Sequence, residues 1–346
     1  MTSNDSSSHG AIGRAAVLWS VIGAMLLGAF ASGVAAVSHD VYSAVGFVHQ
    51  YLDALSRRDA QDALAMPGVN RSDAELKAAG LPEDASRLLL RSAALAELSQ
   101  LDLVDDVTIA DGTHAVTFRY SAAGTPGMTT FTVEQTGHNF LVFPAWRFIV
   151  SPLAALDVTV KNESVLEVNG MTVDAAAASN DNESGVDRAA YLVLTPAAYI
   201  LTHESLMLTG GPSRAVVEAP TAVVPVTLDV GPTPEFTRQV KEQLSGFLDR
   251  CATQKVLQPT GCPFGISLDD RLVDEPQWTI DSYPDVVIVP AGDAWQSRQA
   301  GGSAHCVVTV RSLYDGKIST VDKNVSFSVQ LRIDVRPDES LAITVS

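Results

Sequence analysis

Residues 15–37 most constrain what this chain can become, because they contain no charged side chain, no proline and only two serines. As a helix the run would rise about 34 Å, more than the roughly 30 Å hydrocarbon core of a bilayer. The run predicts one membrane-spanning helix in the cell membrane. Because Arg14 flanks its amino-terminal side, we expect residues 1–14 in the cytoplasm and residues 38–346 outside the cell.

A cleaved signal peptide is the alternative interpretation of the same run. Small residues at 34–36 suit a cleavage site, although the run exceeds the usual apolar region of about 7–15 residues. The length favours an uncleaved anchor. Both interpretations place most of the chain outside the cytoplasm.

The composition indicates a folded and acidic protein. Of the 346 residues, 46% are hydrophobic and 18% are charged, which is enough apolar material for packed cores. The formal net charge of -17 argues against a nucleic-acid partner, because phosphates would be repelled. Abundant alanine, valine and aspartate with little lysine favours a high-GC bacterial source.

Helices are predicted in the first segment after the apolar run. Apolar residues recur at spacings of three and four from Val41 to Leu55, so we expect a helix that ends near Met66, before Pro67-Gly68. The pattern of residues 72–75 is a capping box that opens a second helix. A third helix is predicted over residues 83–100.

From Leu101 to Val150 the apolar period changes to two, which is typical of strands. Asp111-Gly112 predicts a hairpin turn, because glycine accepts a positive φ. The segment 41–150 is therefore expected to hold helices followed by a four-stranded antiparallel meander.

Residues 153–230 show short strand-like runs and no long helical pattern. Breaks at Asn169-Gly170, residues 210–212 and Pro220 separate these runs, which predicts a small β-sandwich with an exposed acidic loop at residues 175–187.

A helix is predicted again from Pro234 to about Val256, where four apolar residues repeat at spacings of four: Phe236, Val240, Leu244 and Leu248. Strand-like runs follow to the end of the chain. The segment 234–346 is thus expected to repeat the plan of a helix followed by an antiparallel sheet.

The sequence resembles known envelope proteins at several places. The run FVHQYLDALSRRDAQDALAM, with the later AWRFIV, resembles NTF2-like domains of bacterial envelope proteins. LDVTVKNESVLEVNG and LVLTPAAYILTHES resemble the small β-domains of TcaA-like membrane proteins, and FLDRCATQKVLQPTGCPFG resembles a second NTF2-like domain of actinobacterial proteins. The zinc-ribbon cysteine pairs of some TcaA-like proteins do not occur. The resemblance implies a role in the cell envelope.

The predicted fold class is therefore α+β, with one transmembrane helix and two NTF2-like domains of helices on a curved antiparallel sheet. A small β-sandwich lies between them. The predicted boundaries are 1–14 for the tail, 15–37 for the transmembrane helix, 38–152 for the first NTF2-like domain, 153–230 for the β-sandwich and 231–346 for the second NTF2-like domain.

The three cysteines predict one disulfide and one buried thiol. Cys251 and Cys262 flank a helix end and a Pro/Gly-rich turn, a short loop that an oxidising compartment would close. Cys306 alternates with Val308 and Val310 on one strand face, so we expect it in a core.

The sequence predicts neither a metal nor a cofactor. His203-Glu204 lacks the second histidine of a zinc-protease helix, and phosphate-binding, dinucleotide and hydrolase motifs are missing. The NTF2-like resemblance implies a pocket in the first cone. Its candidate lining residues, a speculative ligand-binding set, are Tyr51, Asp53, His114, Tyr120, Trp146 and Arg147.

The sequence favours a non-enzymatic interaction or scaffold protein of the bacterial envelope, bound to an envelope protein or a cell-wall ligand. The alternative is a ketosteroid-isomerase-like or cyclase enzyme in the first cone, which would need a carboxylate or histidine facing an open pocket. A cone filled by its own apolar side chains would favour the interaction protein.

Overall fold

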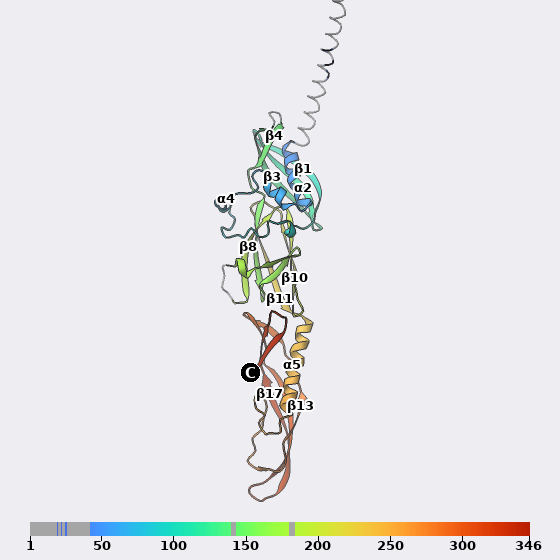
Figure 1. The fold of residues 1–346 in the computed structure, drawn as a ribbon, viewed down its shortest axis with the longest axis vertical. Coiled ribbons are helices and arrows are strands. Elements are labelled where there is room, and N and C mark those ends of the chain that lie inside the picture. Colours follow the sequence, from blue (N-terminus) through green and yellow to red (C-terminus); the bar gives the residue numbers. More distant parts are fainter. Residues whose placement is uncertain (1–18, 20–21, 23–24, 26–41, 140–142, 180–183) are drawn as a thin grey trace, which may run out of the picture. The chain divides into compact units, whose positions relative to one another are not determined.

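A computed structural model of the chain describes residues 19, 22, 25, 42–139, 143–179 and 184–346 (Figure 1). The chain divides into two compact units. Unit 1 holds the residues up to Ala155 together with Leu192–Tyr199 and Val216–Val224, and unit 2 holds the remainder.

The predicted α+β class is wrong, because strands dominate the structure. Strands account for 49% of the described residues and helices for 18%, with four α-helices. The membrane-spanning helix that was part of this prediction has no support either: no helix formed by the described residues is both long and apolar enough to cross a bilayer. Of the predicted span 15–37, all but Trp19, Ile22 and Met25 lie outside the described residues.

Unit 1 contains three short helices and a four-stranded sheet. The helices are α2 (Ala44–Ser56), α3 (Ala60–Ala65) and α4 (Asp73–Ala78), and a 3-10 turn lies at Ser92–Ala94. The strands are β1 (Leu98–Ala110), β2 (Thr113–Ala122), β3 (Thr125–Asn139) and β4 (Phe143–Phe148). They pair antiparallel in the order β1-β2-β3-β4, so the predicted meander is confirmed.

The apolar face of α2 forms the core of unit 1 with this sheet, beside which it lies in Figure 1. The ring of Phe47 packs 5.0 Å from that of Phe148, and Tyr51 meets Phe131 edge-on at 5.8 Å between ring centroids. These aromatic pairs add to the burial of apolar area. The space between α2 and the sheet is thus filled by side chains of unit 1.

The helix predicted to end near Met66 is interrupted. Arg58 adopts a φ of 57°, and the side chain of Asp59 accepts a hydrogen bond from the Asp62 amide, which starts α3 as a separate helix. The apolar spacing favours one continuous helix, but the cap at Asp59 starts a new helix instead.

The third predicted helix, over residues 83–100, does not form. The carbonyl of Ser86 accepts from the Leu192 amide and that of Glu97 from the Ala123 amide. These distant partners satisfy backbone groups that a helix would have paired locally, and β1 already begins at Leu98. Sequence periodicity contains no information about such partners.

The predicted capping box is confirmed at the start of α4. The Ser72 hydroxyl accepts from the Glu75 amide, and the Glu75 carboxylate accepts from the Ser72 amide. Hydrogen bonds donated by Ser72 lower the pKa of Glu75, since they stabilise its carboxylate form.

The middle segment forms one seven-stranded sheet in the order β7-β6-β9-β10-β11-β5-β8. The two separate sheets of a β-sandwich were therefore predicted wrongly. Its strands are β5 (Leu153–Lys161), β6 (Val165–Val168), β7 (Met171–Asp174), β8 (Val186–Leu194), β9 (Ala197–Glu204), β10 (Leu208–Val217) and β11 (Val223–Pro232), with a 3-10 turn at Ala176–Ala178. The Asn169-Gly170 turn is confirmed by positive φ values of 51° and 84°, whereas residues 210–212 lie inside β10 and do not break it.

Unit 2 also contains α5 (Pro234–Ala252), whose predicted apolar face is confirmed: Phe236, Val240, Leu244 and Leu248 are all buried. Eight strands follow, namely β12 (Arg271–Leu272), β13 (Gln277–Ser282), β14 (Ile288–Ala291), β15 (Ala294–Ser297), β16 (Ala300–Arg311), β17 (Ile318–Val329), β18 (Leu331–Val335) and β19 (Leu341–Val345). They form two four-stranded sheets, so the single curved sheet expected for a second NTF2-like domain is not present. Helix α5 packs on β13, and both are labelled in Figure 1.

One of the two predicted domain boundaries after the first domain falls between elements, and the other falls inside a strand. The boundary after residue 152 coincides with the start of β5, whereas the boundary after residue 230 falls inside β11. The division into three modules stays a prediction.

A disulfide joins Cys251, near the end of α5, to Cys262, eleven residues later. Cys306 is a free, buried cysteine, as predicted, and Val308 and Val310 beside it on β16 are buried too. Burial raises the pKa of the Cys306 thiol, which favours its neutral and unreactive form.

Replacing both Cys251 and Cys262 by alanine should lower the free energy of unfolding by about 3 kcal/mol, because the open loop regains conformational entropy in the unfolded state. Urea unfolding followed by circular dichroism, without reductant, measures this change. A loss below about 0.5 kcal/mol, the size of an ordinary surface substitution, would contradict it.

Candidate functional site

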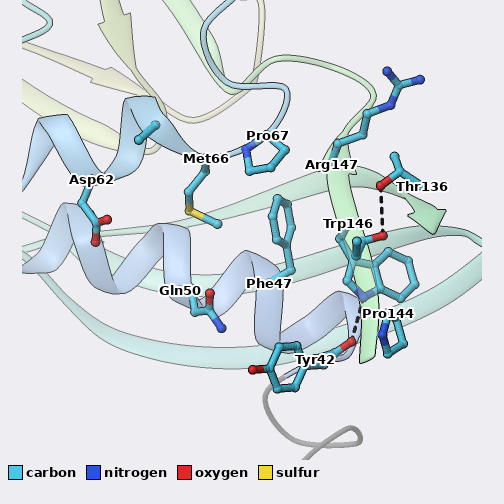
Figure 2. A pocket seen from close by; sticks show the side chains of 12 residues that line it. Tyr42, Phe47, Gln50, Asp62, Met66, Pro67, Thr136, Pro144, Trp146 and Arg147 are labelled. Atoms are coloured by element: carbon cyan, nitrogen blue, oxygen red, sulfur yellow. Dashed lines mark hydrogen bonds between the residues drawn. The ribbon is translucent and has the colours of Figure 1, made fainter. Parts of the chain in front are cut away.

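A cavity of about 450 Å³ opens in unit 1 between α2, α3 and the paired strands β3 and β4 (Figure 2). Most of its wall is apolar. The residues that line it are Tyr42, Phe47, Gln50, Asp62, Ala65, Met66, Pro67, Thr136, Pro144, Ala145, Trp146 and Arg147.

Aromatic contacts fix one wall of this cavity. The indole Nε1 of Trp146 donates a 2.8 Å hydrogen bond to the Tyr42 carbonyl, and the Tyr42 ring stacks on Phe143 with 4.3 Å between centroids. The segment that leads into α2 is thereby attached to β4. The indole satisfies its donor internally and presents mainly apolar surface.

The opposite wall depends on one close backbone approach. Gly68 has a φ of 85°, and a Cβ atom at this position would lie 2.3 Å from the Phe148 carbonyl oxygen. Glycine alone permits this approach, in which the Phe148 amide donates a 3.0 Å hydrogen bond to the Pro67 carbonyl. Met66 and Pro67 are held beside β4 as a result.

The charged groups at the cavity are engaged in ion pairs. Asp62 accepts from Arg57 at 3.2 Å, and Arg147 pairs with Glu134 on β3. In Figure 2 the Arg147 guanidinium extends away from the apolar floor. All four side chains are exposed enough for solvent to weaken these pairs. The arrangement suits an apolar group in the cavity and a polar group at its mouth.

Three of the six predicted site residues lie at or beside the cavity. Trp146 and Arg147 line it, whereas His114 contacts Trp146 edge-on with 5.3 Å between ring centroids. The His114 Nδ1 lies 2.7 Å from a carboxylate oxygen of Asp106 on the neighbouring strand β1, which orients the ring. His114 itself is not among the residues that line the cavity.

The other three predicted residues lie elsewhere. Tyr51 is fully buried and donates a 2.8 Å hydrogen bond to the Thr195 carbonyl. Tyr120 is buried with its hydroxyl 3.0 Å from that of Thr129. Asp53 lies on the solvent face of α2 with an ion pair to Arg57 at 3.5 Å. Tyr51 and Tyr120 belong to the core, where their hydroxyls are already satisfied.

Sequence reasoning missed most of the cavity wall. The prolines were one available signal, because a proline inside a strand pattern indicates an edge strand, and Pro144 does lie on the edge strand β4. Ala65 and Met66 offered none, since their place at the cavity depends on how Pro67 and Gly68 meet β4.

Acidic side chains also gather in unit 2. The pKa of Asp187 is raised, first by burial and then by the charges of Asp174, Asp293 and Glu163. The described residues nevertheless contain no group of three or more histidine, cysteine or carboxylate side chains placed to hold a metal ion.

Comparison of the chain with protein-family models, with curated proteins and with solved structures found no match in any of the three. The NTF2-like and TcaA-like resemblances therefore stay predictions from the sequence.

Replacing Tyr51 by phenylalanine should destabilise the protein by about 1–3 kcal/mol, because the buried Thr195 carbonyl loses its donor. Urea unfolding measures the change. Tyr314→Phe is the matched control, since Tyr314 is fully exposed and should change stability by less than about 0.5 kcal/mol. Equal effects of the two substitutions would contradict the assigned role of Tyr51.

Stability should also fall at alkaline pH. Burial raises the pKa of Tyr51, Tyr120, Tyr191 and Tyr199, that of Tyr191 to about 12. Unfolded tyrosines ionise near pH 10, so the stabilisation is complete below about pH 10 and is lost as the pH rises towards the folded-state values. Urea titrations between pH 8 and 11 test this, and a constant free energy of unfolding across that range would contradict it.

Proposed function

We propose that this chain is a non-enzymatic interaction protein of the bacterial cell envelope that acts outside the cytoplasm and binds a partner through the cavity of unit 1. The observation that carries the proposal is that the polar groups at and near the cavity already have hydrogen-bond or ion-pair partners within unit 1. Tyr51 and Trp146 donate to backbone carbonyls, and Asp62 and Arg147 are in ion pairs. The cavity therefore offers apolar surface for binding.

Export is supported by two features of the chain. The apolar run at residues 15–37 is typical of segments that direct a chain out of the cytoplasm. The disulfide between Cys251 and Cys262 suits an oxidising compartment, since such bonds are rare in the reducing cytosol.

The partner is expected to be a protein or a cell-wall ligand. The net charge of -17 disfavours nucleic acids. An enzyme of the ketosteroid-isomerase type has less support, because it needs a carboxylate or histidine in a dry pocket. Asp62 is the one carboxylate among the described lining residues, and its side chain is largely exposed and paired with Arg57.

Affinity purification of the tagged, full-length chain from the bacterium that encodes it tests the proposal. We expect to recover an envelope partner in stoichiometric amount. The Ala65→Trp substitution should reduce this recovery about tenfold, which corresponds to a loss of about 1.4 kcal/mol of binding free energy. The added ring would occupy the cavity that Ala65 lines.

Gln61→Trp is the matched control, because it adds the same ring to an exposed position of α3 that does not line the cavity. Recovery with this variant should equal that of the unmodified chain. Equal recovery with both variants, or no copurifying partner, would contradict the proposal.

A further inference from the structure

Strand β1 leaves one edge of the unit 1 sheet open. It is the terminal strand of the order β1-β2-β3-β4, and among the described residues only β2 pairs with it. Its pairing with β2 shifts register at three places, between Ser99 and Asp102, between Leu103 and Asp105 and between Thr108 and Ala110, and residues 105–108 keep a regular register. An edge of this kind can add a further strand.

This edge carries more exposed apolar surface than an edge strand normally does. Four side chains are 43–59% exposed: Leu103, Val104, Val107 and Ile109. Edge strands are usually protected by charged side chains, proline, β-bulges or a covering element. In β1 the protection is limited to aspartates and register shifts, without lysine or proline. Exposed β-branched residues on an open edge favour pairing with another chain.

The charge of β1 is entirely negative. Asp102, Asp105 and Asp106 lie on the strand and Asp111 follows in the turn, with no basic residue in β1. On β2, Arg119 lies opposite Asp102, and His114 is 2.7 Å from Asp106. Asp105 uses one carboxylate oxygen to accept from the Asp106 amide. Four carboxylates thus outnumber the one arginine that pairs across this strand.

We propose that the open edge of β1 binds an extended segment of a partner protein, added as a fifth strand, in which two adjacent basic residues lie opposite Asp105 and Asp106 and branched apolar residues lie opposite Val107 and Ile109. On the face that Asp105 shares with Val107, a basic side chain would meet the carboxylate and an apolar one the valine. A second copy of this chain would bring aspartates against aspartates, which is unfavourable. The proposal rests on the interaction function above and identifies what kind of partner this surface fits.

The probe for the test is a fluorescent six-residue peptide of sequence Val-Thr-Val-Lys-Lys-Val, which in antiparallel pairing places its lysines opposite Asp106 and Asp105 and valines opposite Ile109 and Val107. Its binding to the full chain is measured by fluorescence anisotropy. We expect saturable binding, together with slower amide hydrogen exchange at residues 103–109. The same peptide with methylated backbone nitrogens keeps its charge but cannot form the strand ladder, and its affinity should fall at least tenfold. Equal affinity of the two peptides would overturn the proposal, because attraction between charges would then explain the binding.

Two variants locate the site. Val107→Lys places a lysine on the edge, and Asp105→Lys reverses one charge, and each should weaken peptide binding about tenfold. Both positions are exposed, so the fold should persist. Ile318→Lys is the matched control, since Ile318 is a similarly exposed β-branched residue of β17 in unit 2. An equal loss with the control would overturn the assignment to β1.

The outcome is separable from that of the cavity experiment. If the native partner still copurifies at full yield with Val107→Lys but is lost with Ala65→Trp, the interaction function stands and the β1 proposal fails. If the peptide binds at β1 while no native partner depends on the cavity, the proposed use of the cavity fails.

Discussion

The packing of α2 on its four-stranded sheet is the interaction on which unit 1 depends. Tyr51 lies at its centre, in edge contact with Phe131 and Phe148 and with its hydroxyl bonded to the Thr195 carbonyl, 144 residues further along the chain. One side chain thus combines apolar burial with the satisfaction of a distant buried carbonyl. A buried carbonyl without this donor would be costly, so the contact selects the native arrangement as well as stabilising it.

This filled interior explains where binding surface remains. The aromatic rings of Tyr51, Phe131 and Phe148 are buried in the core, so the open surfaces lie at its margins. The cavity beside Trp146 exists because Gly68 brings Pro67 against β4. The open edge of β1 exists because the meander ends there. The cavity offers mainly apolar contacts, whereas the β1 edge combines exposed apolar side chains with aspartates.

Local patterns were sufficient where a few neighbouring residues decide the structure. The Ser72–Glu75 capping box, the Asp111-Gly112 turn and the apolar face of α5 all formed as expected, because their hydrogen bonds or spacing are complete within a short segment. The helix expected over residues 83–100 failed for the opposite reason, since its carbonyls bond to Leu192 and Ala123. Periodicity reports which faces are apolar, whereas distant backbone partners decide between helix and extended chain.

The sequence by itself determined the Asp111-Gly112 and Asn169-Gly170 turns, the Ser72–Glu75 capping box and the apolar faces of α2 and α5. It also determined the cysteines available for a disulfide and the acidity of the chain. The tertiary structure decided the mainly β fold class, the joining of seven strands in one sheet and the cavity. It also separated Tyr51, Asp53 and Tyr120 from the cavity that Trp146 and Arg147 line. The physical reason is that strand pairing and side-chain convergence depend on residues far apart in the chain, whose meeting no local pattern encodes.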